Sequence, residues 1–232
     1  MIGVLLLAFG LYLATMAPSV TPGDPGELLS AAKTLGIGHP PGYPLTTILT
    51  HAFASAIPFA SFAYRGNLVA AVVAAVAAWL TGLLVRRLTG SLIAGITSGL
   101  LLAVSETFWS QALIAKPTYA LNAAFVAGTL LALLRAGAET RRQGSSHRWL
   151  ALAAFLAGLG VANHYMAAFF LPGYLILAWP VLRGGRPSRA AWRTHGRSRS
   201  SSGCGWRKGY PRPRSKKGTA PRPNRCGGPW KI

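Results

Sequence analysis

The sequence predicts an all-α integral membrane protein with about six transmembrane helices, an extracytoplasmic first loop that carries interfacial helices, and a disordered basic C-terminal tail. Three observations support this prediction. Residues 1–182 are dominated by Ala, Leu, Val, Ile and Phe, whereas residues 183–232 hold most of the charge. Only four acidic residues occur in the chain. Two of them, Asp24 and Glu27, follow the first apolar stretch, where a carboxylate is costly unless it has a function.

The apolar stretches have the length that a membrane requires, which is about 20 residues for about 30 Å of hydrocarbon. The first stretch lacks a basic n-region, so we expect a retained span rather than a signal peptide. Residues 45–60 are also apolar but contain His51 and Pro58, which favours an interfacial or re-entrant helix, with a seventh span as the alternative. The expected spans are residues 2–17, 66–85, 92–109, 118–135, 149–165 and 167–182.

Residues 183–232 differ in kind from the rest of the chain. They hold 15 of the 24 Lys/Arg residues and no acidic residue, so most of the net charge of +20 belongs to them. A segment of this composition cannot bury enough apolar surface to fold. It is either a genuine cytoplasmic tail that binds anionic lipid headgroups or out-of-frame translation of GC-rich DNA. We favour the second because the composition changes abruptly, and we expect two parts, a membrane domain over 1–182 and the tail.

The distribution of basic residues predicts the orientation, because cytoplasmic loops carry an excess of Lys and Arg. With the N-terminus in the cytoplasm, the two inner loops contain six arginines. The outer face then carries only Lys33, Arg65 and Lys116. We therefore expect a protein of the inner or plasma membrane whose first loop, with Asp24 and Glu27, is extracytoplasmic. The inner arginines are Arg86, Arg87, Arg135, Arg141, Arg142 and Arg148.

This topology brings polar residues from distant parts of the sequence to one membrane face. Such a cluster at the boundary with water suits a polar substrate that is carried on a lipid. The residues of the first loop and the start of the next span are Asp24, Glu27, His39, Tyr43, Arg65 and Asn67. Those from later in the chain are Trp109, Gln111, Lys116, Tyr119, Asn163 and His164.

Several short motifs in this region resemble the DUF2723 family in order and spacing across residues 1–182. That family is similar to protein O-mannosyltransferases and other membrane glycosyltransferases of the GT-C type. The resemblance implies a multi-span enzyme that takes a sugar from a polyprenyl-phosphate donor on the non-cytoplasmic side, with an acidic residue of the first outer loop as base. The motifs are Gly23-Asp24-Pro25-Gly26-Glu27-Leu28, His39-Pro40-Pro41-Gly42-Tyr43-Pro44-Leu45, Arg65-Gly66-Asn67-Leu68, Thr107-Phe108-Trp109-Ser110-Gln111, Tyr119-Ala120-Leu121-Asn122 and Gly158-Leu159-Gly160-Val161-Ala162-Asn163-His164.

One position departs from the family pattern. An acidic residue often precedes the Tyr of the Tyr-x-Leu motif in that family, whereas this chain reads Lys116-Pro117-Thr118 before Tyr119. This difference weakens a catalytic role for that loop.

The residues suit glycosyl transfer on chemical grounds as well. Transfer to a hydroxyl needs a carboxylate that takes the acceptor proton, and Asp24 or Glu27 offers one. It also needs donor groups against the departing phosphate, for which the candidates are Arg65, Lys116, His39 and His164. Trp109 and Tyr43 offer flat faces for a sugar or an isoprenoid.

Structural roles remain open for the same residues. Asp24 and Glu27 can cap a helix and supply its first-turn acid. Asn163 and His164 can form an interhelical polar pair, and Lys116 can anchor the interface. His51 on its apolar segment fits packing better than catalysis.

The leading hypothesis is a membrane glycosyltransferase, or its N-terminal part, that uses a polyprenyl-phosphate sugar. The alternative is a transporter or flippase for a lipid-linked or polar solute, which would place ionisable groups near the bilayer midplane. A nucleic-acid binder is not expected, because the tail shows no binding motif. We expect no cofactor, and no metal ligands are assigned.

Overall fold

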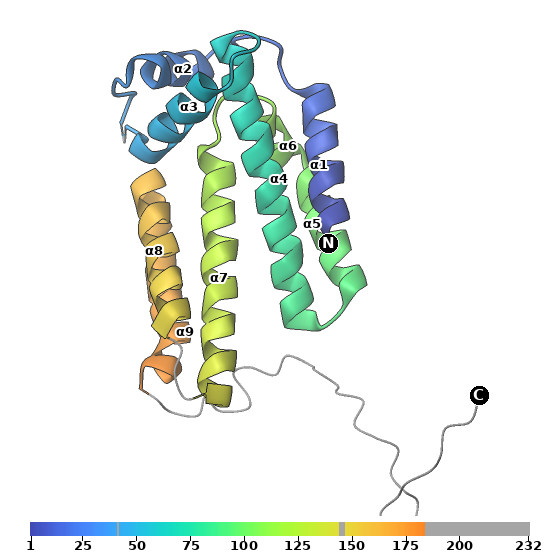
Figure 1. The fold of residues 1–232 in the computed structure, drawn as a ribbon, viewed down its shortest axis with the longest axis vertical. Helices are drawn as coiled ribbons and strands as arrows, with labels where there is room; N and C mark the ends of the chain where they lie inside the picture. Colours follow the sequence, from blue (N-terminus) through green and yellow to red (C-terminus); the bar gives the residue numbers. More distant parts are fainter. Residues whose placement is uncertain (41, 144–146, 184–232) are drawn as a thin grey trace, which may run out of the picture. The chain divides into compact units, whose positions relative to one another are not determined.

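The computed structural model describes residues 1–40, 42–143 and 147–183, and every regular element within them is a helix (Figure 1). The predicted all-helical class is confirmed for these residues. The predictions for 184–232 lie outside the described residues. The helices are α1 (Ile2–Thr15), α2 (Asp24–Thr34), α3 (Pro44–Ala56), α4 (Phe62–Thr89), α5 (Leu92–Val104), α6 (Glu106–Ala112), α7 (Thr118–Gln143), α8 (His147–Asn163), the 3-10 helix η1 (Tyr165–Phe170) and α9 (Leu171–Leu182).

Three helical segments of the described chain are long and apolar enough to cross a membrane, namely Phe62–Thr89, Thr118–Arg141 and Tyr165–Leu182. The bent pair of α5 and α6 makes a fourth if the two helices form one span. α1 is apolar but has only 14 residues. α3 has 13 residues and a length of about 20 Å, which is too short for about 30 Å of hydrocarbon. α3 is not among the candidate spans of the described residues, and the interfacial or re-entrant interpretation of 45–60 stays a prediction.

The expected span over residues 92–109 is present as a bent pair of helices that can form one span. Ser105 has an extended backbone conformation, with φ −65° and ψ 131°, and it separates α5 from α6. The two helices meet at a bend of 66°. Glu106 follows the break and begins α6.

α4 lies at the centre of the first packed group and contacts α1, α5 and α7. Its buried face is almost entirely alanine, at positions 71, 74, 75 and 78. This face packs around Tyr12, which is fully buried and donates a hydrogen bond of 2.9 Å to the carbonyl of Ala103. Small side chains let helices approach closely in a membrane, where apolar burial alone does not drive association.

Glycines bring the backbones of α4 and α5 almost into contact. A Cβ atom on Gly82 would lie 2.6 Å from the carbonyl oxygen of Gly95, and one on Gly99 would lie 2.9 Å from that of Ala78. Because the contacting atoms belong to the backbone, a methyl group at either position would force the two helices apart. Gly82, Gly95 and Gly99 thus set the short distance between the axes of α4 and α5.

Gly82→Ala is therefore expected to lower the free energy of unfolding by about 1–3 kcal/mol, the usual cost of overpacking. Gly10→Ala is the matched control, because nothing lies within 4 Å of the added methyl group. Thermal unfolding of both variants in detergent, followed by loss of helical circular dichroism, measures the difference. Equal melting temperatures for the two variants would show that α4 and α5 are not packed this closely.

α7, α8 and α9 form a second packed group around Ala132, Leu133, Ala153 and Ala178. α2 and α3 lie together at one end of the long helices, beside the first turns of α4 and α7 and the last turn of α8 (Figure 1). Three connections therefore meet at this end, namely the segment before α3, the α6–α7 loop and the α8–η1 junction.

Candidate functional site

Asp24 and Glu27 both lie in the first turn of α2, at the end of the molecule where these connections meet. Gly23 precedes the helix with a φ of 89°, a conformation that favours glycine. The N-cap residue is therefore Gly23, which makes no side-chain cap, and not Asp24. The positive end of the helix dipole favours both carboxylates at this position.

Asp24 pairs with Lys116 across 92 residues of sequence. The Lys116 ammonium donates to Asp24 Oδ2 at 2.5 Å. The Lys116 side chain is 15% exposed, while that of Asp24 is 49% exposed. The Asp24 carboxylate is thus accessible to an incoming group, whereas most of the Lys116 side chain is covered by the protein.

The pair stays charged over the whole neutral range. The hydrogen bond from Lys116 and its charge hold the pKa of Asp24 below the usual 3.8. Partial burial opposes the charge of Lys116, but the Asp24 carboxylate outweighs it and raises the pKa of Lys116 above 10.5. The contribution of Asp24 to stability is therefore lost as pH falls through its lowered pKa, and that of Lys116 as pH rises through its raised pKa.

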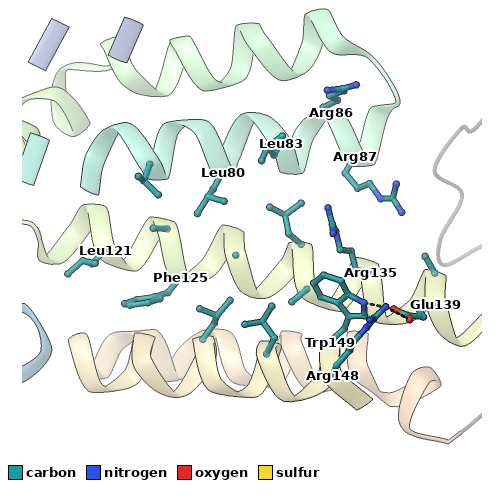
Figure 2. Close-up of a pocket in the computed structure, with 18 of the residues that line it drawn as sticks. Leu80, Leu83, Arg86, Arg87, Leu121, Phe125, Arg135, Glu139, Arg148 and Trp149 are labelled. Atoms are coloured by element: carbon teal, nitrogen blue, oxygen red, sulfur yellow. Dashed lines mark hydrogen bonds and ion pairs between the residues drawn. The ribbon is translucent and has the colours of Figure 1, made fainter. Parts of the chain in front are cut away.

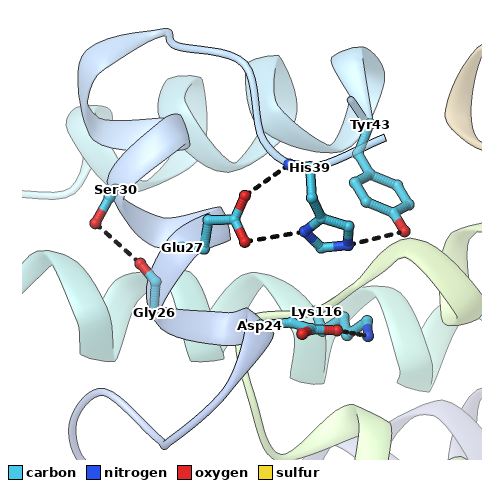
Figure 3. A network of polar contacts seen from close by, with 7 residues as sticks. All are labelled: Asp24, Gly26, Glu27, Ser30, His39, Tyr43 and Lys116. Atoms are coloured by element: carbon cyan, nitrogen blue, oxygen red, sulfur yellow. Dashed lines mark hydrogen bonds and ion pairs between the residues drawn. The ribbon is translucent and has the colours of Figure 1, made fainter. Parts of the chain in front are cut away.

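Glu27 organises the segment before α3 (Figure 3). Its Oε1 accepts from the backbone N–H of His39 at 2.6 Å, and its Oε2 lies 3.0 Å from His39 Nδ1. The other ring nitrogen, Nε2, lies 3.4 Å from the hydroxyl of Tyr43. The Tyr43 side chain is buried, which raises the pKa of its hydroxyl. Glu27, His39 and Tyr43 thus form one chain of polar contacts beside the Asp24–Lys116 pair.

Tyr43 adopts a left-handed backbone conformation with a φ of 46°. A bulky residue there costs on the order of 1–3 kcal/mol and is retained only where the surroundings determine it. Such outliers gather at functional sites, which supports a specific role for this loop.

Aromatic rings extend the site toward α7 and α8. The His164 ring lies 5.7 Å from that of Tyr43, 6.4 Å from that of Tyr119 and 4.9 Å, stacked, from that of Tyr165. The Lys116 ammonium lies 5.4 Å from the centre of the Tyr119 ring. Tyr119 and Tyr165 are about half exposed, so flat apolar faces border the charged pair. Sequence reasoning missed Tyr165, whose signal was its position directly after His164.

Asn163 lies beneath this surface and fixes three helices together. It is 1% exposed, and its Oδ1 accepts from the hydroxyl of Thr46 at 2.6 Å. Its Nδ2 donates to the carbonyl of Thr118 at 2.9 Å and to Asn122 Oδ1 at 2.8 Å. Asn122 ends the Tyr119-Ala120-Leu121-Asn122 motif and could have been found there, whereas Thr46 had no signal. Asn163 therefore supports the site without facing it.

The structure does not bring four other candidates into contact with this network. Arg65 donates to backbone carbonyls of the α3–α4 turn. Asn67 donates to two carbonyls of the α1–α2 linker at 2.7 and 3.0 Å. Trp109 donates to the Thr15 hydroxyl at 3.1 Å, and the buried side-chain oxygen of Gln111 has no hydrogen-bond partner among the described residues. The first three hold connections between helices.

Metal ligands are not grouped in this part of the molecule. Over residues 1–40, 42–143 and 147–183, no set of three His, Cys, Asp or Glu side chains lies close enough together to hold a metal ion.

Comparison with known proteins gives one consistent result. Residues 24–181 match a family model described as the N-terminal domain of the protein O-mannosyl-transferase TMEM260. The mouse (Mus musculus) protein of that name is 36% identical over 172 residues, covering 74% of this chain and 24% of the relative. A Dictyostelium discoideum protein of the same name is 29% identical over 173 residues, covering 70% of this chain and 21% of the relative. No solved structure matches.

The chain therefore spans about a quarter or less of the length of these curated relatives. The predicted kinship with protein O-mannosyltransferases is confirmed, while the narrower DUF2723 assignment stays a prediction. The match begins at Asp24 and includes every residue of the network around it. The chain belongs to the family of the protein O-mannosyl-transferase TMEM260, whose N-terminal domain it matches.

Proposed function

We propose that this chain is the N-terminal part of a membrane glycosyltransferase of the GT-C type that transfers mannose from a polyprenyl-phosphate donor to a protein hydroxyl. Both relatives are named protein O-mannosyl-transferase, which supports mannose as the sugar and a protein as the acceptor. The observation that carries the proposal is the Asp24–Lys116 pair, a base and a cation held side by side at a helix end.

The pair divides the reaction between two charged groups. The acceptor oxygen forms a bond to the anomeric carbon, and its proton passes to the Asp24 carboxylate. The bond between the anomeric carbon and the phosphate oxygen breaks, and the electron pair leaves with the polyprenyl phosphate. Lys116 stabilises the charge on that phosphate. Lys116 and Asp24 neutralise each other when they pair, so an anionic donor competes for Lys116 and frees the carboxylate to act as base.

The neighbouring groups position the substrates. Glu27 fixes both the backbone and the ring of His39, which leaves the imidazole oriented toward the site. His164 accepts from the backbone N–H of Met166 through Nδ1, so its Nε2 offers a further hydrogen-bond donor to the donor phosphate or the sugar. The half-exposed rings of Tyr119 and Tyr165 offer faces on which a sugar or an isoprenoid chain can pack.

The proposed topology has six spans, namely α1, α4, the bent pair α5–α6, α7, α8 and η1–α9. The protein lies in the inner or plasma membrane, and its N-terminus is on the cytoplasmic side. The charge distribution supports this topology. The Asp24 network lies at the end of the bundle where α4 and α7 begin, whereas Arg86, Arg87 and Arg135 lie near the other ends of these helices. No Asp, Glu, Lys, Arg or His lies between 66 and 85 or between 117 and 134, which suits an enzyme acting at one face.

Cysteine labelling tests the orientation. Cys204 and Cys226 are first replaced by Ser, and single cysteines are then introduced at Ser30 and Thr89, both exposed and at opposite ends of the bundle. We expect an impermeant thiol reagent to label Ser30→Cys in intact cells, and Thr89→Cys only after the membrane is opened. The reverse pattern would place the proposed site in the cytoplasm.

Sugar transfer tests the function itself. Membranes from cells that express the longest natural open reading frame encoding this chain should transfer labelled mannose from polyprenyl-phosphate mannose to protein. The matched control is membrane from cells that lack the open reading frame. Equal incorporation in both membranes would refute the proposed activity.

A further inference from the structure

A large cavity lies between α4, α7 and α8 and extends from Leu121, near the start of α7, to arginines near the other end of that helix (Figure 2). Its volume of about 1140 Å³ exceeds the range of about 300–1,000 Å³ that is usual for pockets that hold small molecules. Leu80, Leu83, Leu121 and Phe125 are among the side chains of its apolar walls. The α4 wall alone, from residue 72 to residue 87, is about 22 Å long at 1.5 Å per residue. One leaflet contributes about half of the roughly 30 Å of hydrocarbon, so an acyl chain fits along this wall.

Four arginines line one end of the cavity, and three of them lie at its mouth, because Arg86 points from α4 toward α5 (Figure 2). Arg86 and Arg87 come from the last turn of α4, Arg135 from α7 and Arg148 from α8. The acidic residue that lines the cavity is Glu139. Both of its carboxylate oxygens already have partners, because one accepts from Arg148 at 2.6 Å and the other from the indole N–H of Trp149. Neither Arg86 nor Arg87 has an ion-pair partner within the described residues. The mouth therefore carries an excess of positive charge.

Trp149 lines the cavity next to two of these arginines. The guanidinium of Arg135 lies 4.9 Å from the centre of its ring, and that of Arg148 lies 5.6 Å from it. The aromatic ring and the Glu139 carboxylate thus hold two arginines in fixed positions beside the apolar walls. Arg87 and Arg135 both point into the gap between α4 and α7 (Figure 2).

We infer that this cavity binds an anionic phospholipid of the bilayer, with its phosphate among Arg87, Arg135 and Arg148 and an acyl chain along the walls of α4 and α7. Charge complementarity selects this occupant over a zwitterionic lipid, and the length of the apolar wall selects a lipid over a free phosphate. The site is separate from the proposed transfer site, since the arginines lie near the other ends of α4 and α7. The inference does not depend on the glycosyltransferase proposal. In the proposed orientation the lipid belongs to the cytoplasmic leaflet.

The test is a binding measurement with the purified full chain in mild detergent. Acyl-labelled phosphatidylglycerol is displaced by unlabelled phosphatidylglycerol, by phosphatidylcholine with the same acyl chains, or by glycerol phosphate. We expect phosphatidylglycerol to compete at least tenfold more strongly than phosphatidylcholine and glycerol phosphate to compete weakly. Equal competition by the two lipids would overturn charge selection, and equal competition by glycerol phosphate would overturn the role of the apolar walls.

Matched variants locate the site. At about 1 kcal/mol per arginine, Arg87→Gln should weaken binding of phosphatidylglycerol about fivefold, and Arg87→Gln with Arg135→Gln about 30-fold. Arg141→Gln removes the same charge from an exposed position of α7 outside the cavity lining and should change binding less than twofold. Wild-type binding by the double variant would disprove the site.

A second pair of variants tests the walls. Leu80→Trp fills the cavity and should weaken both lipids, whereas Leu101→Trp, on the exposed face of α5, should not. Helical circular dichroism confirms that each variant is folded, and the exposed arginine variants remain informative if Leu80→Trp fails to fold. Native mass spectrometry identifies the occupant. Detection of a dimer without lipid would show that a second copy covers the cavity and would overturn the inference.

Discussion

Asp24→Asn is expected to lower the rate of mannose transfer by at least about 10²-fold, the lower end of the range for losing a general base. The substitution keeps the shape of the side chain and its position in the first turn of α2, but the amide cannot take the acceptor proton. The free energy of unfolding should change little, because the carboxylate is about half exposed and water screens its pairing with Lys116. Transfer of labelled mannose in membranes, normalised to the amount of protein, measures the effect.

Glu27→Gln is the matched control for this prediction. It removes a carboxylate one helical turn away but leaves an oxygen that can still accept from the backbone N–H of His39. We expect a smaller loss of transfer than for Asp24→Asn. If Asp24→Asn transfers mannose at the wild-type rate, Asp24 has only a structural role in α2.

Lys116→Met should produce the second large effect, a loss of about 10²–10³-fold in kcat, as for removal of one preorganised group that stabilises developing charge. The methionine keeps most of the length and packing of the side chain. Binding of polyprenyl-phosphate mannose should weaken as well, whereas binding of a polyprenyl alcohol without phosphate should not change. Titration of both lipids against the wild type and the variant separates charge recognition from recognition of the chain.

The pH profile gives an independent readout for Lys116. Lys116 holds the pKa of Asp24 below its usual 3.8, so its removal should let that pKa rise toward the ordinary value. The acidic limb of the residual activity is then expected to move to higher pH. Lys33→Met removes a lysine from the exposed end of α2 and should leave both the rate and the profile unchanged. An unshifted acidic limb in Lys116→Met would mean that the lysine does not act on Asp24.

The long helices could be predicted from the sequence because their apolar length alone determines them. α4 was expected at 66–85 and extends over Phe62–Thr89, since Ser61 caps its start by accepting from the backbone N–H of Tyr64. The break at Ser105 could not be predicted, because no proline or glycine lies between α5 and α6. α4 contacts both α5 and α6, so tertiary packing holds the two pieces in place.

The site was predictable in its residue types but not in its pairings. Asp24 and Lys116 were both candidates, yet their contact joins positions that are 92 residues apart, and no local pattern encodes it. Asn67 met the same criteria of polarity and position, but the structure uses its amide to bind the backbone of the α1–α2 linker. Polarity at a membrane face thus predicts a site region, while the three-dimensional contacts decide which side chains face the substrate.

The central claim is that Asp24 and Lys116 act as one unit in sugar transfer, and a double-mutant cycle tests it most directly. Transfer of mannose is measured for the wild type, Asp24→Asn, Lys116→Met and the double variant in the same membranes. Residues that act together are strongly non-additive, so the double variant should be about as slow as the slower single variant. Multiplication of the two single effects would show that the residues act independently, and wild-type rates in both single variants would remove the pair from the reaction.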